Sequence, residues 1–152
     1  MALPSKLPLY GALGNDFYLA EGDFLPSRDE VRALCLPTDG RQVDGLLLLR
    51  PNSSSYEFSV LNADGSHGGL SGNGLRCAAY HLSLVHQEKQ EPYRFLTEAG
   101  VVEATMPATE EVRLLFHELA PLAPRPLPGQ FSPQEIETRV GCTFENIWFV
   151  HI

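Results

Sequence analysis

The stretch Leu61-Asn-Ala-Asp-Gly-Ser-His-Gly-Gly-Leu-Ser-Gly-Asn-Gly-Leu-Arg-Cys-Ala-Ala-Tyr80 decides the fold of this 152-residue chain. Before it, apolar and polar residues alternate from Tyr56 onward, a pattern that predicts a half-buried strand. In its second half, apolar residues recur at helical spacing between Leu75 and Leu82. The sequence therefore predicts a strand, a glycine-rich loop and a helix in direct succession.

The start of this predicted helix is a candidate anion site. The first backbone N–H groups of a helix have no partner within the helix, and the helix dipole places positive charge there. A carboxylate or phosphate could bind between Ser71 and Gly74, where Gly72 and Gly74 let the backbone approach a ligand closely. The alternative is that Gly and Asn occur here only because the turn needs positive φ.

Four short motifs lie along the chain: Tyr10-Gly-Ala-Leu-Gly-Asn-Asp-Phe17, Val43-Asp-Gly45, Asn62-Ala-Asp-Gly-Ser66 and Ser71-Gly-Asn-Gly-Leu-Arg-Cys77. In the same order, they resemble the H-G-L-G-N-D-F, A-D-G-L, N-A-D-G-S and C-G-N-G-x-R-C motifs in the N-terminal half of diaminopimelate epimerase. Thr97-Glu-Ala-Gly-Val101 also has a counterpart there. Because these ordered motifs span most of the chain, it is identified as a member of that family.

The resemblance implies an α+β fold, in which a mixed β barrel or sheet wraps around a central helix as one lobe of a two-lobe protein. Ser27 and Glu30 form a capping box, which predicts a second helix over residues 28–35, ended by Pro37. The central helix is expected to end near His86. Further strands are predicted at residues 7–10, 17–20, 46–49 (closed by Pro51), 94–98, 101–106 and 112–116, and the last three form a meander.

The predicted domain organisation is an epimerase-like lobe at residues 1–118, a proline-rich linker at 119–133, and, at 134–152, either the start of a second lobe or a closing strand. The five prolines of the linker remove donors for sheet pairing and disfavour a helix. Ser132 to Glu135 resemble a second capping box, whereas residues 135–140 alternate like a strand, so a helix and a strand both stay open here. Residues 147–152 predict a strand; in the family a similar strand continues into a second lobe, which we expect to be missing here.

The composition is that of a globular protein, with 43% hydrophobic residues. A net charge of −8, with 11 scattered basic residues, argues against nucleic acid or an anionic membrane as partner. With no apolar run of about 20 residues and no signal-peptide pattern, a cytoplasmic location is expected. Cys35, Cys77 and Cys142 are widely spaced, which predicts reduced thiols and neither disulfides nor a metal site.

The resemblance implies a cofactor-independent reaction, in which two cysteine thiols move a proton between opposite faces of an amino acid. Ser71 takes the position of the first cysteine, and the second belongs to the second lobe. A thiol has a pKa of about 8.5 and an alcohol one near 15.7, so serine adds roughly 10 kcal/mol to forming the base. His67 is near in sequence, but no acidic partner to orient it is evident.

Other family positions are present in this chain. Asn15 and Asn62 match asparagines whose side chains face the substrate, and Gly72 and Asn73 match residues whose backbone N–H groups hold its α-carboxylate. The resemblance therefore implies a small amino-acid ligand bound through its α-carboxylate. The alternative for both asparagines is turn formation, since Asn tolerates left-handed backbone and bonds to neighbouring backbone groups.

Neighbouring polar residues are assigned structural roles. We expect Asp64 to form a turn, Arg76 to brace the loop, and Cys77 to be a core thiol. His81 and His86 are expected to cap or flank the helix.

Three hypotheses about function follow. The first is a lobe of an isomerase for the conversion of LL- to meso-diaminopimelate, in lysine and peptidoglycan precursor biosynthesis, that is inactive or very weak alone. The second is a non-catalytic binding or assembly module in which two copies pair, each in place of the other's missing lobe, and so cover apolar surface. The third is weak isomerase activity on another amino acid, with Cys142 near the loop.

Overall fold

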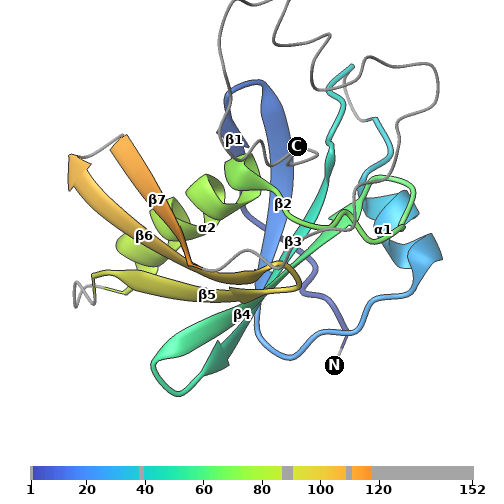
Figure 1. Cartoon of the computed structure of the whole chain (residues 1–152). Coiled ribbons are helices and arrows are strands. Elements are labelled where there is room, and N and C mark those ends of the chain that lie inside the picture. The colour runs from blue at the N-terminus through green and yellow to red at the C-terminus, as the bar shows by residue number, and fades with distance from the viewer. Residues whose placement is uncertain (1, 38–39, 87–90, 109–110, 118–152) are drawn as a thin grey trace, which may run out of the picture. The chain divides into compact units, whose positions relative to one another are not determined.

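The computed structural model describes residues 2–37, 40–86, 91–108 and 111–117 (Figure 1). Along these residues the elements are β1 (Leu9–Ala12), β2 (Asn15–Glu21), α1 (Arg28–Leu34), β3 (Gly45–Asn52), β4 (Ser55–Asn62), α2 (Gly72–Val85), β5 (Tyr93–Thr97), β6 (Gly100–Ala108) and β7 (Glu111–His117). The predicted linker at 119–133 and the segment at 134–152, which includes Cys142, lie outside the described residues.

The strands form one seven-stranded sheet in which their spatial order equals their order in the chain. The pairs β1–β2, β3–β4, β5–β6 and β6–β7 are antiparallel. The pairs β2–β3 and β4–β5 are parallel, and α1 and α2 are the crossover connections that parallel neighbours require. The three-stranded meander predicted after the central helix is confirmed as β5, β6 and β7.

The sheet curves around α2 (Figure 1). This helix contacts β1 and β7, the two edge strands of the sheet, as well as β2, β3 and β6. One helix can reach both edges of a seven-stranded sheet only if the sheet is strongly coiled. The predicted fold class, a mixed sheet wrapped around a central helix, is confirmed.

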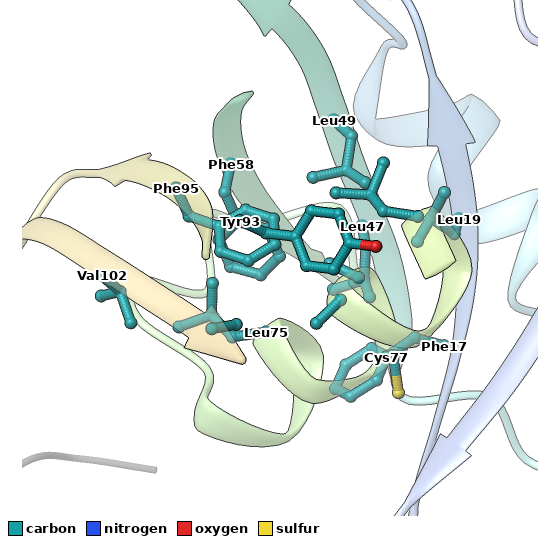
Figure 2. Packing of buried hydrophobic residues seen from close by; sticks show 14 of the residues in the cluster. Phe17, Leu19, Leu47, Leu49, Phe58, Leu75, Cys77, Tyr93, Phe95 and Val102 are labelled. Atoms are coloured by element: carbon teal, nitrogen blue, oxygen red, sulfur yellow. The ribbon is translucent and has the colours of Figure 1, made fainter. Parts of the chain in front are cut away.

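Two apolar clusters cover the two faces of the sheet. Leu47 and Leu49 of β3 belong to the cluster that includes Leu75 of α2 (Figure 2). Successive side chains of a strand point to opposite faces of the sheet. Leu46 therefore belongs to a second cluster, together with Val31 of α1. Strand β3 therefore packs on both faces over residues 45–49, where its sequence is continuously apolar. Each fully buried Leu contributes roughly 1.5–3 kcal/mol.

The capping box predicted at the first helix is confirmed. The Ser27 side chain accepts a hydrogen bond from the Glu30 backbone N–H, and the Glu30 carboxylate accepts one from the Ser27 backbone N–H at 2.7 Å. The hydrogen bonds from Ser27 lower the pKa of the Glu30 carboxyl. The helix ends at Leu34, one residue before the predicted end, and Cys35 is its C-cap.

The prediction that Pro51 closes its strand is wrong. Strand β3 continues to Asn52, and Pro51 pairs with Tyr56 of β4. The pairing of β3 with β2 stops at Leu49, so no β2 residue requires a donor from Pro51.

No described helix is long and apolar enough to cross a membrane.

Candidate functional site

The N-terminus of α2 is formed by the glycine-rich motif, as the sequence predicted. Ser71 is the N-cap, with φ −122° and ψ 110°, and its Oγ accepts a hydrogen bond from the Gly74 N–H at 2.9 Å. The N–H groups of Gly72 and Asn73 donate to no residue in the described part of the chain, and both residues are only partly buried. Two helix-terminal donors are therefore available to an anion.

The two glycines of this turn have different roles. A Cβ at Gly72 would meet only the Arg76 guanidinium, at 3.4 Å, so a ligand can approach the backbone there. A Cβ at Gly74 would lie 2.9 Å from Leu47 and 3.2 Å from Phe58, which are buried under the helix. The expected contribution of Gly74 to ligand approach is therefore wrong, because close packing of α2 on the sheet and the bond to Ser71 occupy this residue.

A chain of side-chain hydrogen bonds holds Asn73. Its Nδ2 donates to Oδ1 of Asn15 at 2.8 Å, and its Oδ1 accepts from Nη1 of Arg76 at 3.4 Å. Asn15 is the first residue of β2, so these bonds fix the start of α2 to the β1–β2 turn. Asn15 is thus held beside Asn73 with its side-chain oxygen occupied, and its contact with a ligand stays a prediction.

Asn62 ends β4 and makes contacts typical of a turn. Its backbone N–H donates to the Ser66 carbonyl at 2.8 Å, and its Nδ2 donates to Ser66 Oγ at 2.9 Å. Asp64 Oδ1 accepts from the hydroxyl and the backbone N–H of Ser66, and these bonds lower the pKa of the Asp64 carboxyl. Asp64 is confirmed as a turn former, and the turn alternative accounts for the observed bonds of Asn62.

Asp44 connects the first, second and third motifs, a role that the sequence analysis missed. Its Oδ2 accepts from the Asp16 N–H at 2.8 Å, its own N–H donates to the Asp16 carbonyl, and its carbonyl accepts from the Ala63 N–H at 2.9 Å. The next residue, Gly45, pairs with Asn62, and any Cβ there would collide with the Leu61 carbonyl oxygen. All four motifs therefore meet at one end of the sheet.

The fifth matching segment forms the β5–β6 turn. The Thr97 hydroxyl donates to the Gly100 carbonyl at 2.7 Å and accepts from the Ala99 N–H. From this turn, the Glu98 carboxylate lies 4.0 Å from Nδ1 of His67. Both side chains are exposed, and no hydrogen bond between His67 and Ser71 is present in the described residues. A Ser–His catalytic pair is not assembled.

The two described thiols are unsuited to act as a base. Cys77 is 2% exposed, and its burial, with a smaller contribution from the Asp16 carboxylate, raises the pKa of its thiol to about 11. Burial also raises the pKa of the Cys35 thiol. Both thiols are therefore protonated near neutral pH, and Cys77 is confirmed as a core residue.

A polar cluster lies at the other end of α2. Glu21 accepts a hydrogen bond from Nε2 of His81 at 3.2 Å and from Nε2 of His86 at 3.0 Å, and the Tyr10 hydroxyl lies 2.9 Å from Nδ1 of His81. His86 is the C-cap, as expected, but His81 lies within α2 and is buried, so its expected place at the helix end is wrong. The partnership of both histidines with Glu21 was not predicted. Neither this cluster nor any other group of His, Cys, Asp and Glu among the described residues is arranged to hold a metal ion.

No protein-family model matches the chain, but curated proteins of one family do. Diaminopimelate epimerase of a Nitratiruptor species is 39% identical over 105 residues, which are 68% of this chain and 42% of the relative. Diaminopimelate epimerase of Synechococcus elongatus is 32% identical over 144 residues, which are 91% of this chain and 48% of the relative. The chain thus spans about half the length of the curated relatives it matches.

The fold also has a counterpart among solved structures. A putative phenazine biosynthesis PhzC/PhzF protein from Clostridium difficile superimposes with a TM-score of 0.53 at 18% identity, over 86% of this chain and 46% of that protein. At this level of identity the likeness concerns the fold alone. With its four ordered motifs joined at the start of α2, and with 32–39% identity to curated relatives, the chain belongs to the diaminopimelate epimerase family.

Proposed function

We propose that this chain is a diaminopimelate-epimerase-like lobe that binds a small amino acid through its α-carboxylate at the start of α2. The observation that carries the proposal is the pair of Gly72 and Asn73 N–H groups, which have no described acceptor and lie within the family's motif. Diaminopimelate is the amino acid in the name of the relatives, which makes it the first ligand to test. Lysine and peptidoglycan precursor biosynthesis is the corresponding pathway.

The arrangement supports modest affinity. A charge-assisted hydrogen bond contributes about 1.5–3 kcal/mol, and the dipole at a helix N-terminus adds about 0.3–1 kcal/mol. Immobilising the ligand opposes these terms. A net binding free energy of about −4 kcal/mol corresponds to a dissociation constant near 1 mM. Two such bonds and the dipole total about 3–7 kcal/mol before the cost of immobilisation, so we expect binding no tighter than the millimolar range from these groups alone.

We further propose that the chain by itself does not epimerise this ligand at an appreciable rate. Ser71 stands where the family motif has a cysteine, and its Oγ has no described base beside it. Forming an alkoxide there costs roughly 10 kcal/mol more than forming a thiolate. The nearest thiol in sequence, Cys77, is buried and has a pKa raised to about 11.

A matched pair of variants tests the binding site. Gly72 is the first helical residue, a position where proline is tolerated and where the preceding Ser71 already has the extended backbone that proline requires. Gly72→Pro removes one N–H donor, whereas Gly72→Ala keeps it. By isothermal titration with LL-diaminopimelate, we expect Gly72→Ala to bind and Gly72→Pro to lose most affinity. Equal binding by both variants would contradict the proposed site.

The absence of turnover is tested by solvent exchange. In D2O with LL-diaminopimelate, we expect no deuterium at Cα from the wild-type chain over hours, as followed by proton NMR. Deuterium incorporation that disappears in Ser71→Ala would show that the hydroxyl acts as a base after all.

A second candidate function is a homodimeric binding or assembly module. The observation in its favour is the edge strand β7, where Leu115 is 58% and Phe116 is 37% exposed. Exposed apolar edge strands readily pair with another chain. Light scattering at increasing concentration tests this candidate: a dimer that Leu115→Lys weakens would support it, and a monomer at all concentrations would exclude it.

A further inference from the structure

Within the function proposed above, the geometry points to Arg76 as a residue that binds the ligand's carboxylate together with the Gly72 and Asn73 N–H groups. The inference rests on the proposed carboxylate site and adds a charged group to its two backbone donors. Sequence reasoning assigned Arg76 only a bracing role. Three features indicate that Arg76 also takes part in ligand binding: its position, its lack of a described counter-ion, and its place near the positive end of the helix dipole.

The position of Arg76 follows from helix geometry. Residues four apart lie on the same face of a helix, and their side chains lean toward its N-terminus. Arg76 accordingly reaches back over the first turn: its Nη1 donates to Asn73 Oδ1 at 3.4 Å and lies 3.4 Å from where a Cβ of Gly72 would be. The guanidinium is therefore beside the two residues whose N–H groups are available.

The charge of Arg76 has no partner among the described carboxylates. Of the six other arginines in the described part of the chain, five lie within 4.0 Å of an Asp or Glu, namely Arg32, Arg41, Arg50, Arg94 and Arg113, whereas Arg28, like Arg76, has no such pair. Arg76 is partly buried, and one long hydrogen bond to a neutral amide oxygen uses one of the five donors of its guanidinium. A bound carboxylate would supply the missing counter-ion.

The Arg76 side chain points toward the N-terminal end of α2, which is electrostatically unfavourable without a ligand. The N-terminal end of a helix carries positive partial charge, so a cation folded back over the first turn is repelled. No acidic residue lies in the first turn of α2 to offset this repulsion. An anion at Gly72 and Asn73 reverses the sign of the interaction, because it is attracted by the dipole and by the guanidinium together.

This arrangement separates a binding role from a structural one. If Arg76 serves ligand binding, replacing it with a neutral residue should weaken carboxylate binding without lowering the stability of the ligand-free protein. If Arg76 only braces the loop, the same replacement should lower stability, and binding should fall only in proportion.

The experiment compares Arg76→Gln, Arg76→Lys and a charge-matched control, Arg94→Gln, whose exposed arginine pairs with Glu103 on the sheet. Titration with LL-diaminopimelate is expected to show about tenfold weaker binding for Arg76→Gln, a smaller loss for Arg76→Lys, and wild-type affinity for the control. The melting temperature of ligand-free Arg76→Gln is expected to equal or exceed that of the wild type.

The outcomes are distinguishable. If wild-type protein does not bind diaminopimelate at all, the proposed function and this inference both fail. If the wild type binds and Arg76→Gln binds equally well, the inference alone fails. It also fails if Arg76→Gln lowers the melting temperature and Arg76→Lys does not recover binding, because that result describes a brace.

Discussion

The side-chain nitrogen of Asn73, in the first turn of α2, lies 2.8 Å from Oδ1 of Asn15, 58 residues earlier in the chain. This hydrogen bond joins the first and last of the four motifs by which the family is recognised. It also holds the residue whose backbone N–H we assign to ligand binding. The family motifs are thus connected parts of one structure around the start of α2.

Removal of this bond should affect both stability and binding. Asn15→Ala is expected to lower the free energy of unfolding by about 1 kcal/mol, the usual contribution of a partly buried hydrogen bond. Because Asn73 is then less well held, affinity for LL-diaminopimelate should also fall. Urea denaturation and calorimetric titration provide the two measurements. Asn52→Ala, which removes an exposed 3.4 Å contact to Glu57, is the control that should change neither.

Ser71 should prove to be a helix cap. Ser71→Ala removes the acceptor for the Gly74 N–H and is expected to lower the free energy of unfolding by about 1 kcal/mol. Urea denaturation measures this loss. Ser71→Asn, which keeps a side-chain acceptor at the N-cap, is the control and should unfold close to the wild-type urea concentration. A cap role would be refuted if Ser71→Ala also unfolds there.

Ser71→Cys should create a reactive thiol. A cysteine at a helix N-terminus has a lowered pKa and reacts as the thiolate. Alkylation by iodoacetamide at pH 7 is therefore expected to modify the introduced thiol rapidly, while Cys35 and Cys77 remain unmodified because they are buried. Mass spectrometry of peptides locates the label. Slow labelling at position 71 would argue against a positive, solvent-accessible helix end.

Cys77 should make the protein sensitive to alkaline pH. Its thiol has a pKa near 9.0 when exposed and about 11 in the folded chain, so the folded state holds its proton more tightly. The resulting stabilisation is complete below pH 9 and is lost as the pH rises to 11. A shift of about two pKa units corresponds to at most about 2.7 kcal/mol. Urea denaturation at several pH values should show a steeper decline for wild type than for Cys77→Ala.

Glu21 should stabilise the opposite end of α2. Its two carboxylate oxygens each bind one histidine, so Glu21→Ala leaves His81, a buried residue, with one partner fewer. We expect a loss of about 1–3 kcal/mol in the free energy of unfolding. Glu57→Ala, whose exposed carboxylate pairs with Arg50, should cost less than about 1 kcal/mol. Equal losses in the two variants would contradict a special role of the cluster.

Local sequence patterns predicted much of this fold. The strand, loop and helix between Leu61 and Tyr80, and the capping box at Ser27, follow from periodicity and from contacts three or four residues apart. The partners of Asp44 and Glu21 could not be predicted, because their hydrogen bonds span 19 to 65 residues. Such contacts depend on which strands become neighbours in the sheet, and the pattern of a single sequence does not specify this.

The same limit explains the misinterpreted residues. The role of Gly74 depends on the packing of α2 against Leu47, which the sequence pattern does not show. The strand could continue through Pro51 because the pairing of β2 with β3 ends at Leu49, and this too is not visible in the sequence. Of the candidate site, the position of Gly72 and Asn73 was predictable from the loop–helix junction. The bonds between Asn15, Asn73 and Arg76 were not, since they depend on how the β1–β2 turn meets α2.

Carboxylate binding at the start of α2 can be observed directly by following the backbone amide resonances of Gly72 and Asn73 during titration with LL-diaminopimelate. If Gly72 and Asn73 bind the carboxylate, both resonances shift saturably with a midpoint no lower than the millimolar range, while the resonances of His81 and His86 at the far end of α2 stay unchanged. Shifts confined to other parts of the protein, or no shifts at ligand concentrations well above this range, would contradict carboxylate binding at this site.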